Sequence, residues 1–149
     1  MSKTTKIVLG VVVIVVIVLL ATMSGKKDNV GPIKIGVSTM LSGDWAILGK
    51  NIVNASNLAI NEINSKGGIN GRKLELIVED SGLDSKAGLS AAQKLINVDN
   101  VSYIIGGTSS NGTLAAAPIA NESKVIYMTP VTGGKNVDNG GEYIFRTAN

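Results

Sequence analysis

Between residues 33 and 146, short β-branched segments alternate with longer segments of helical periodicity. The strand-like segments are 33–38, 73–79, 101–106, 125–128 and 142–146. Apolar residues recur with helical spacing across 52–63, while Asp84 and Ser109 or Ser110 are N-cap residues for two further helices. Such alternation predicts right-handed βαβ crossovers. The expected fold class is therefore α/β, a mostly parallel, doubly wound sheet with helices on both faces.

The N-terminal segment has a different character. Lys3 and Lys6 precede an uninterrupted apolar run over 7–21, which with Thr22 and Met23 makes a helix of about 25 Å, close to the bilayer core of about 30 Å. This pattern fits a cleaved signal peptide or an uncleaved hydrophobic membrane anchor. Met23 makes a poor cleavage site, which favours the anchor. Either interpretation sends the rest of the chain across a membrane, to a membrane-anchored, periplasmic or secreted location.

The predicted organisation has three parts. Residues 1–23 are the signal peptide or membrane anchor, 24–31 are a short tether, and 32–149 are the folded domain. Charge follows the same division, because Lys3, Lys6, Lys26 and Lys27, set against the single acid Asp28, produce the net charge of +3, whereas residues 31–149 are neutral. We therefore expect no nucleic-acid partner.

Composition also removes most catalytic chemistries. The 149 residues include no cysteine and no histidine. Thiolate and imidazole metal ligands, cysteine nucleophiles and a Ser–His–Asp triad are therefore excluded. Glu79 and Asp80 are adjacent on a predicted strand, so they point to opposite faces and make a poor acid–base pair. Asp80 lines a crevice or is a solvated acid. We expect a non-enzymatic protein without a metal or cofactor.

Ligands of open parallel sheets bind outside the carboxyl ends of the strands, near the point where the strand order reverses. In this chain that rule selects the segments 39–49, 80–83, 107–111 and 129–136. Ser109 and Ser110 start a predicted helix, where they bind an anion or serve only as an ordinary cap. Thr132 and Gly133 offer a hydroxyl and backbone groups, or form a plain glycine-rich connector. Trp45, the only tryptophan, covers the apolar part of a ligand or caps the edge of the core.

Several motifs, in fixed order, carry a resemblance to a known family. They are Leu41-Ser42-Gly43, the segment 59–64 followed by 66–74 (KGGINGRKL), Glu79-Asp80 with Asp84, Tyr103–Gly106 with the serine cluster, Met128-Thr129-Pro130 and Phe145-Arg146-Thr147. Residues 33–147 resemble the N-terminal lobe of type I periplasmic solute-binding proteins, the leucine/isoleucine/valine-binding family of ABC importers. The resemblance implies that two lobes close like a hinge on a small polar solute, an amino acid or related amide. Permease subunits then recognise the closed form.

The resemblance also implies site residues. Ser110 matches the ligand-binding serine of the family, and Val131 and Gly133 match two positions that contact the amino acid, the first through its carbonyl. Thr is common where this chain has Gly133, so Thr132 is the residue that could replace the missing hydroxyl. An aromatic of the first loop aligns with Leu48, and Trp45 could replace it. The predicted ligand-binding set is Trp45, Ser109, Ser110, Val131, Thr132 and Gly133.

Two further functions share some of these features. A membrane-tethered receptor domain of the same fold would use the same ligand chemistry for sensing, and an α/β enzyme would use the same sheet. The lack of histidine, cysteine and a phosphate loop speaks against the enzyme. The family has a second lobe, which this chain is expected to lack. One lobe alone is expected to be marginally stable and to bind no solute with micromolar affinity.

Overall fold

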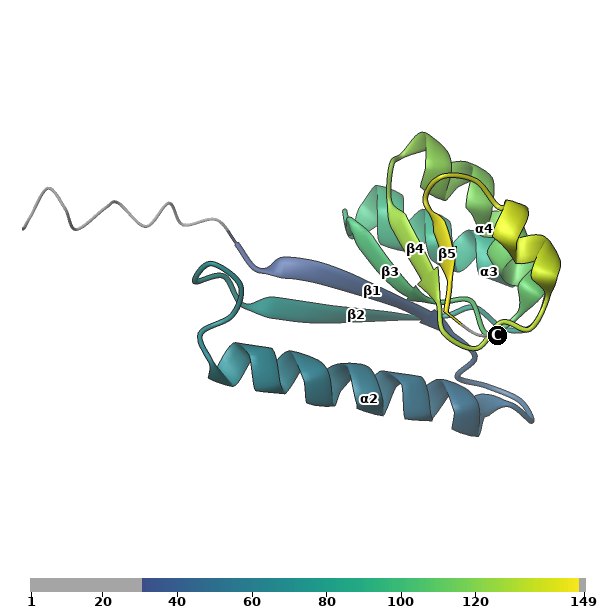
Figure 1. The fold of residues 1–149 in the computed structure, drawn as a ribbon. Helices are drawn as coiled ribbons and strands as arrows, with labels where there is room; N and C mark the ends of the chain where they lie inside the picture. The colour runs from purple at the N-terminus through teal and green to yellow at the C-terminus, as the bar shows by residue number, and fades with distance from the viewer. Residues whose placement is uncertain (1–30, 148–149) are drawn as a thin grey trace, which may run out of the picture. The chain divides into compact units, whose positions relative to one another are not determined.

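The structure is a computed structural model that describes residues 31–147. Its sheet has the strand order β2-β1-β3-β4-β5, and every neighbouring pair is parallel (Figure 1). The predicted signal peptide or anchor of residues 1–23 lies outside the described residues, as does all of the tether except Gly31. In chain order the elements are β1 (Ile33–Thr39), α2 (Ala46–Ser65), β2 (Leu74–Asp80), α3 (Ser85–Gln93), a π-helical turn η1 (Lys94–Val98), β3 (Tyr103–Gly106), α4 (Ser110–Glu122), β4 (Ile126–Thr129), a 3-10 turn η2 (Lys135–Asn139) and β5 (Ile144–Arg146).

The parallel α/β architecture predicted from the alternation is confirmed. All five predicted strands form, although β3 and β5 begin two residues later than expected, at Tyr103 and Ile144. The chain passes from β1 to β2 and then back across β1 to β3, so the strand order reverses at β1. This is the topological switch point at which ligands of such sheets bind.

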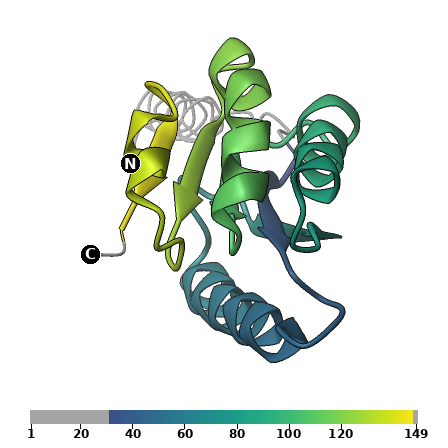
Figure 2. The ribbon, with the colours of Figure 1, turned by 90° about the vertical axis from the view of Figure 1, so that its right-hand side faces the viewer.

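Helices cover the two faces unequally, as Figure 2 shows: α2 lies on one side of the sheet, and α3 and α4 lie on the other. The larger core lies under α3 and α4, where Leu95, Ile104 and Tyr127 are buried. Burial raises the pKa of Tyr127 to about 12. The two helices approach so closely that a Cβ on Gly88 would lie 2.5 Å from the Cα of Gly112, so this contact requires a glycine. This packing fixes the N-terminus of α4 over the sheet edge.

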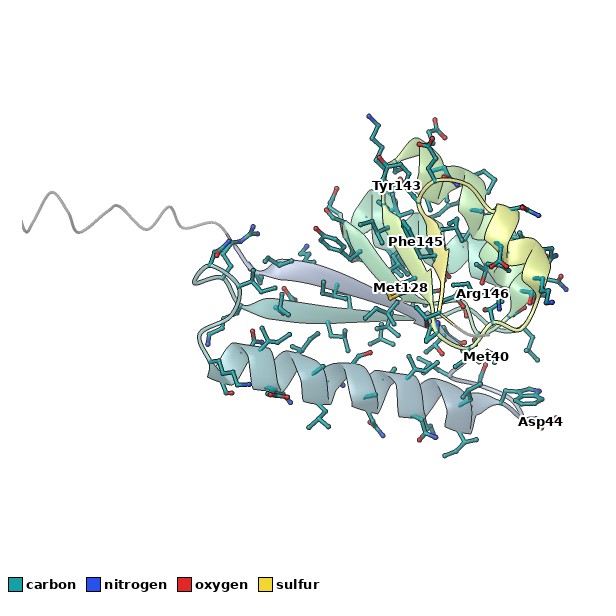
Figure 3. All side chains as sticks on the ribbon, in the orientation of Figure 1. Met40, Asp44, Met128, Tyr143, Phe145 and Arg146 are labelled. Carbon is teal, nitrogen blue, oxygen red and sulfur yellow. The ribbon has the colours of Figure 1, made fainter. Side chains whose placement is uncertain are left out.

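On the opposite face, α2 packs on β1 and β2. Side chains alternate along a strand, so the buried Ile104, Tyr127 and Ile144 place their neighbours Tyr103, Met128 and Phe145 on the α2 side. Those three side chains are 42–47% exposed, and Figure 3 labels Met128 and Phe145 on these strands. The described residues thus leave half of this face uncovered.

Glycine at the end of β3 is required by a close backbone approach. Gly106 has φ +154, and a Cβ there would lie 1.9 Å from the carbonyl oxygen of Ser38. We expect Gly106→Ala to lower the free energy of unfolding by more than about 2 kcal/mol, measured by urea denaturation. Gly71→Ala is the control, because φ there is +80 but no atom lies within 4 Å. Equal losses for the two variants would contradict the steric explanation.

An ion pair joins η2 to β5. Arg146 donates from Nε to Asp138 Oδ1 at 2.7 Å and from Nη2 to Oδ2 at 2.8 Å, and this hydrogen bonding lowers the pKa of Asp138 below its ordinary 3.8. A lowered carboxyl pKa stabilises the fold above the ordinary value, and the contribution disappears as the pH falls through the folded-state pKa.

We therefore expect Asp138→Asn to be less stable than wild type at about pH 6, and the difference to shrink by about pH 3, measured by urea denaturation. Glu142→Gln removes a neighbouring exposed carboxylate and should leave this pH dependence in place. A difference between wild type and Asp138→Asn that stays constant with pH would contradict the assignment.

Candidate functional site

Because the strands are parallel, the carboxyl ends of β1, β2, β3 and β4 meet at one edge of the sheet (Figure 1). The connecting segments 40–45, 81–84, 107–109 and 130–134 follow these ends. The helices α2, α3 and α4 begin at this edge, so their free N–H groups and positive dipole ends lie there. The sequence rule selected these segments, and the structure brings them together.

Ser110 and Gly134 connect the segments after β3 and β4. The Gly134 N–H donates to the Ser110 Oγ at 3.2 Å. A Cβ on Gly134 would lie 2.6 Å from the same oxygen, which explains the glycine. The serine hydroxyl accepts in this contact, so its own hydrogen is available to donate to a ligand. Gly134 was not among the predicted site residues, and only the adjacent Gly133-Gly134 pair hinted at it.

Ser109 is the N-cap of α4. Its Oγ accepts from the Gly112 N–H at 3.3 Å and donates to the Leu83 carbonyl at 2.7 Å. The hydroxyl's single hydrogen is therefore engaged with the segment after β2. Of the two serines left open as caps by the sequence, Ser109 is the cap and Ser110 begins the helix. The structure gives Ser109 the task of holding α4 in place.

Thr132 points into the protein. It is 1% exposed, and its hydroxyl donates to the Gly107 carbonyl. The buried Thr129 hydroxyl lies 2.5 Å from it and 3.0 Å from the same carbonyl. These bonds hold the segment after β4 against the segment after β3. The Thr132 hydroxyl is thus committed inside the protein, so the structure does not present it at the surface in place of a hydroxyl on Gly133.

Val131 and Gly133 flank this inward threonine and lie outside. The Val131 side chain is 38% exposed. A Cβ on Gly133 would meet no atom within 4 Å, so this backbone faces open space. Both positions are therefore exposed at this edge of the sheet. Trp45 lies at the same edge, after β1, with 57% of its side chain exposed.

Asp80 organises the segments after β1 and β2. Its Oδ1 accepts from the N–H groups of Leu41 and Gly82, both at 3.0 Å, and its Oδ2 accepts from the Ser42 hydroxyl at 2.9 Å. The bond from Leu41 is the main reason that the pKa of Asp80 lies below its ordinary 3.8; burial acts in the opposite direction. The sequence placed Asp80 at a strand end, but gave no signal for its long-range partners.

The described residues offer little support for other kinds of site. Across 31–147, no cluster of three or more acidic side chains could hold a metal ion, and no helix there is long and apolar enough to cross a membrane. A cavity of about 610 Å³ lies at the opposite, amino edge, and its lining combines aliphatic side chains with the polar side chains of Lys34, Arg72, Asn100, Ser102 and Tyr103. In the described residues α2, α3 and α4 all begin at the carboxyl edge, beside the reversal of strand order, so the carboxyl edge is the better candidate for the solute site.

Known proteins are similar to this chain in sequence and in fold. Residues 32–149 match the family model described as periplasmic binding protein. The leucine-specific-binding protein of Salmonella typhimurium is 34% identical over 133 residues, which cover 89% of this chain and 35% of the relative. The chain thus spans about a third of the length of that curated relative.

Solved structures agree. The branched-chain amino acid transporter substrate-binding protein of Streptococcus pneumoniae, in complex with isoleucine, superimposes with a TM-score of 0.73 at 30% identity, covering 77% of this chain and 33% of that one. A solute-binding protein of an ABC transporter from Rhodopseudomonas palustris BisB5, in complex with 3,4-dihydroxybenzoic acid, gives 0.72 at 32% identity, covering 78% and 32%. With the parallel fold, the ordered motifs and the family model in agreement, the chain belongs to the periplasmic binding protein family.

Proposed function

We propose that this chain is the first lobe of an extracytoplasmic solute-binding component of an ABC importer. The observation that carries the proposal is the Gly134–Ser110 hydrogen bond, which joins two strand-end segments into one surface beside the N-terminus of α4. The solute is a small molecule with a carboxylate, a branched-chain or other amino acid. A second lobe closes over it, and permease subunits bind the closed form.

The charged groups of an amino acid match this surface. The Ser110 hydroxyl hydrogen and the N-terminus of α4 favour the carboxylate, each such dipole contact contributing about 0.3–1 kcal/mol when exposed. The Val131 carbonyl accepts from the ammonium, and the Gly133 N–H supplies a further donor. Main-chain groups suit this task because their positions are fixed by the sheet and by the Thr132–Gly107 contact.

The remaining predicted residues have supporting roles in this proposal. Ser109 caps α4, and Thr132 fixes the segment between Val131 and Gly133, so neither hydroxyl contacts the solute. Trp45 covers the apolar side chain of the solute from the segment after β1. The hydrophobic run of 7–21 places this lobe on the outer side of a membrane, as a cleaved signal or as an anchor. Relatives are named as binding proteins, which supports binding rather than catalysis as the activity.

Nitrogen-15 NMR of the full chain with millimolar L-leucine tests the proposal. We expect binding weaker than micromolar, because one lobe supplies half of the contacts. The largest chemical-shift changes should occur at the amides of Ser110, Gly133 and Gly134. Ser110→Ala should weaken these shifts because it removes the donor. Ser90→Ala, on the exposed surface of α3, is the matched control and should leave them unchanged. Shifts confined to the cavity around Arg72 and Tyr103 would contradict the proposal.

The two adjacent glycines should respond differently to the same added methyl group. Gly133→Ala should leave the fold and the L-leucine shifts nearly intact, since its Cβ meets open space. Gly134→Ala should push Ser110 away, lower the free energy of unfolding by about 1–3 kcal/mol and reduce the L-leucine shifts. Urea denaturation and the NMR titration measure both effects. The account of the surface fails if Gly133→Ala is the more damaging change.

A further inference from the structure

We propose that Asp80 is a positioning residue of the solute site: its carboxylate holds the segment 40–45 against the end of β2 and so fixes the wall of the site that carries Trp45. This inference rests on the proposed function for the identity of the site. It assigns Asp80 no direct contact with the solute, and it concerns a residue that touches neither Ser110 nor the segment after β4.

The contacts of Asp80 converge from three points. Thr39 at the end of β1 is the register partner of Asp80 at the end of β2, and the Ser81 N–H donates to the Thr39 carbonyl at 2.9 Å. Just beyond this pair, the Leu41 N–H and the Ser42 hydroxyl both donate to the Asp80 carboxylate. The Asp80 side chain on β2 thereby fixes Leu41 and Ser42, the two residues that follow the buried Met40.

The segment 40–45 lacks the side-chain cap that is present at the starts of α3 and α4. α3 is capped by the Asp84 side chain and α4 by the Ser109 side chain, but α2 starts after Trp45 without any side-chain cap. The turn at Gly43, φ +73, is closed only by a local bond from the Ala46 N–H to the Gly43 carbonyl at 3.1 Å. Within residues 31–147, the two bonds to Asp80 are therefore the long-range polar restraint on this segment.

A carboxylate suits this position better than a neutral side chain. Three donors point at it, and an ionised carboxylate has two acceptor oxygens and no hydrogen of its own. Asparagine keeps one acceptor oxygen, which could serve Leu41 and Gly82, but it presents an amino group to Ser42. Bonds to a charged acceptor are also about twice as strong as neutral ones. A wall held in place before the solute arrives lowers the ordering cost of binding.

Amide hydrogen exchange in the full chain, kept in solution by a mild detergent, tests this role. In Asp80→Ala we expect the Leu41 amide to exchange about tenfold faster, while the core amide of Ile104 keeps its rate. Asp80→Asn should give a smaller increase, because one acceptor remains. Asp44→Asn is the matched control: it also removes one carboxylate, from the segment 40–45 itself, where Figure 3 shows Asp44 at the outer end, and should change neither rate.

Local release should also reach Trp45, whose fluorescence anisotropy is expected to fall in Asp80→Ala and to stay unchanged in Asp44→Asn. An unchanged Leu41 rate in both Asp80 variants would overturn the proposal, as would equal acceleration of Leu41 and Ile104, which indicates global destabilisation. Should Asp80→Ala fail to fold, Asp80→Asn decides by the same criterion. If L-leucine changes the amide chemical shift of neither Ser110 nor Gly133 in wild type, the proposed function fails. The exchange rate of the Leu41 amide would still show whether Asp80 restrains the segment 40–45.

Discussion

The hydrogen bond from the Gly134 N–H to the Ser110 hydroxyl is the contact on which the site depends. It joins segments that follow two neighbouring parallel strands, and it sets Ser110 at the start of α4 with its own hydrogen free to donate. The bond is possible because Gly134 has no side chain, and because Thr132, two residues earlier, is drawn inward to the Gly107 carbonyl. Replacement of either residue would therefore separate the helix N-terminus from the backbone beside it.

A second restraint works on the other side of the switch point. Asp80 links the segments after β1 and β2, just as Ser110 and Gly134 link those after β3 and β4. The Ser109–Leu83 bond connects the two halves, since it runs from the start of α4 to the segment after β2. Two serine hydroxyls and one carboxylate thus tie the segments after the four strands to one another. A site for a small charged solute requires segments whose positions are fixed in this way.

Local chemistry explains which features the sequence could predict. β-branched runs between glycine-rich turns identified the strands, and their alternation with helices predicted the parallel sheet. The position of ligand sites at the carboxyl ends of parallel strands then predicted the edge of the sheet for the site. The direction of Thr132 could not be predicted, because it depends on a carbonyl at Gly107, far away in the chain. The same holds for Asp80, whose partners Leu41 and Ser42 become neighbours only when β1 pairs with β2. The sequence could not decide between the adjacent Ser109 and Ser110 as the N-cap of α4. The choice depends on a long-range contact, because the Ser109 hydroxyl donates to the Leu83 carbonyl.

A crystal structure with a bound branched-chain amino acid would show at which edge of the sheet the solute lies. We expect the carboxylate to lie within hydrogen-bonding distance of the Ser110 hydroxyl, and the backbone of Val131 and Gly133 to contact the solute while the Thr132 hydroxyl still donates to the Gly107 carbonyl. A solute held at the amino edge of the sheet, beside Arg72 and Tyr103, with Ser110 and Gly134 still paired and untouched, would contradict this expectation.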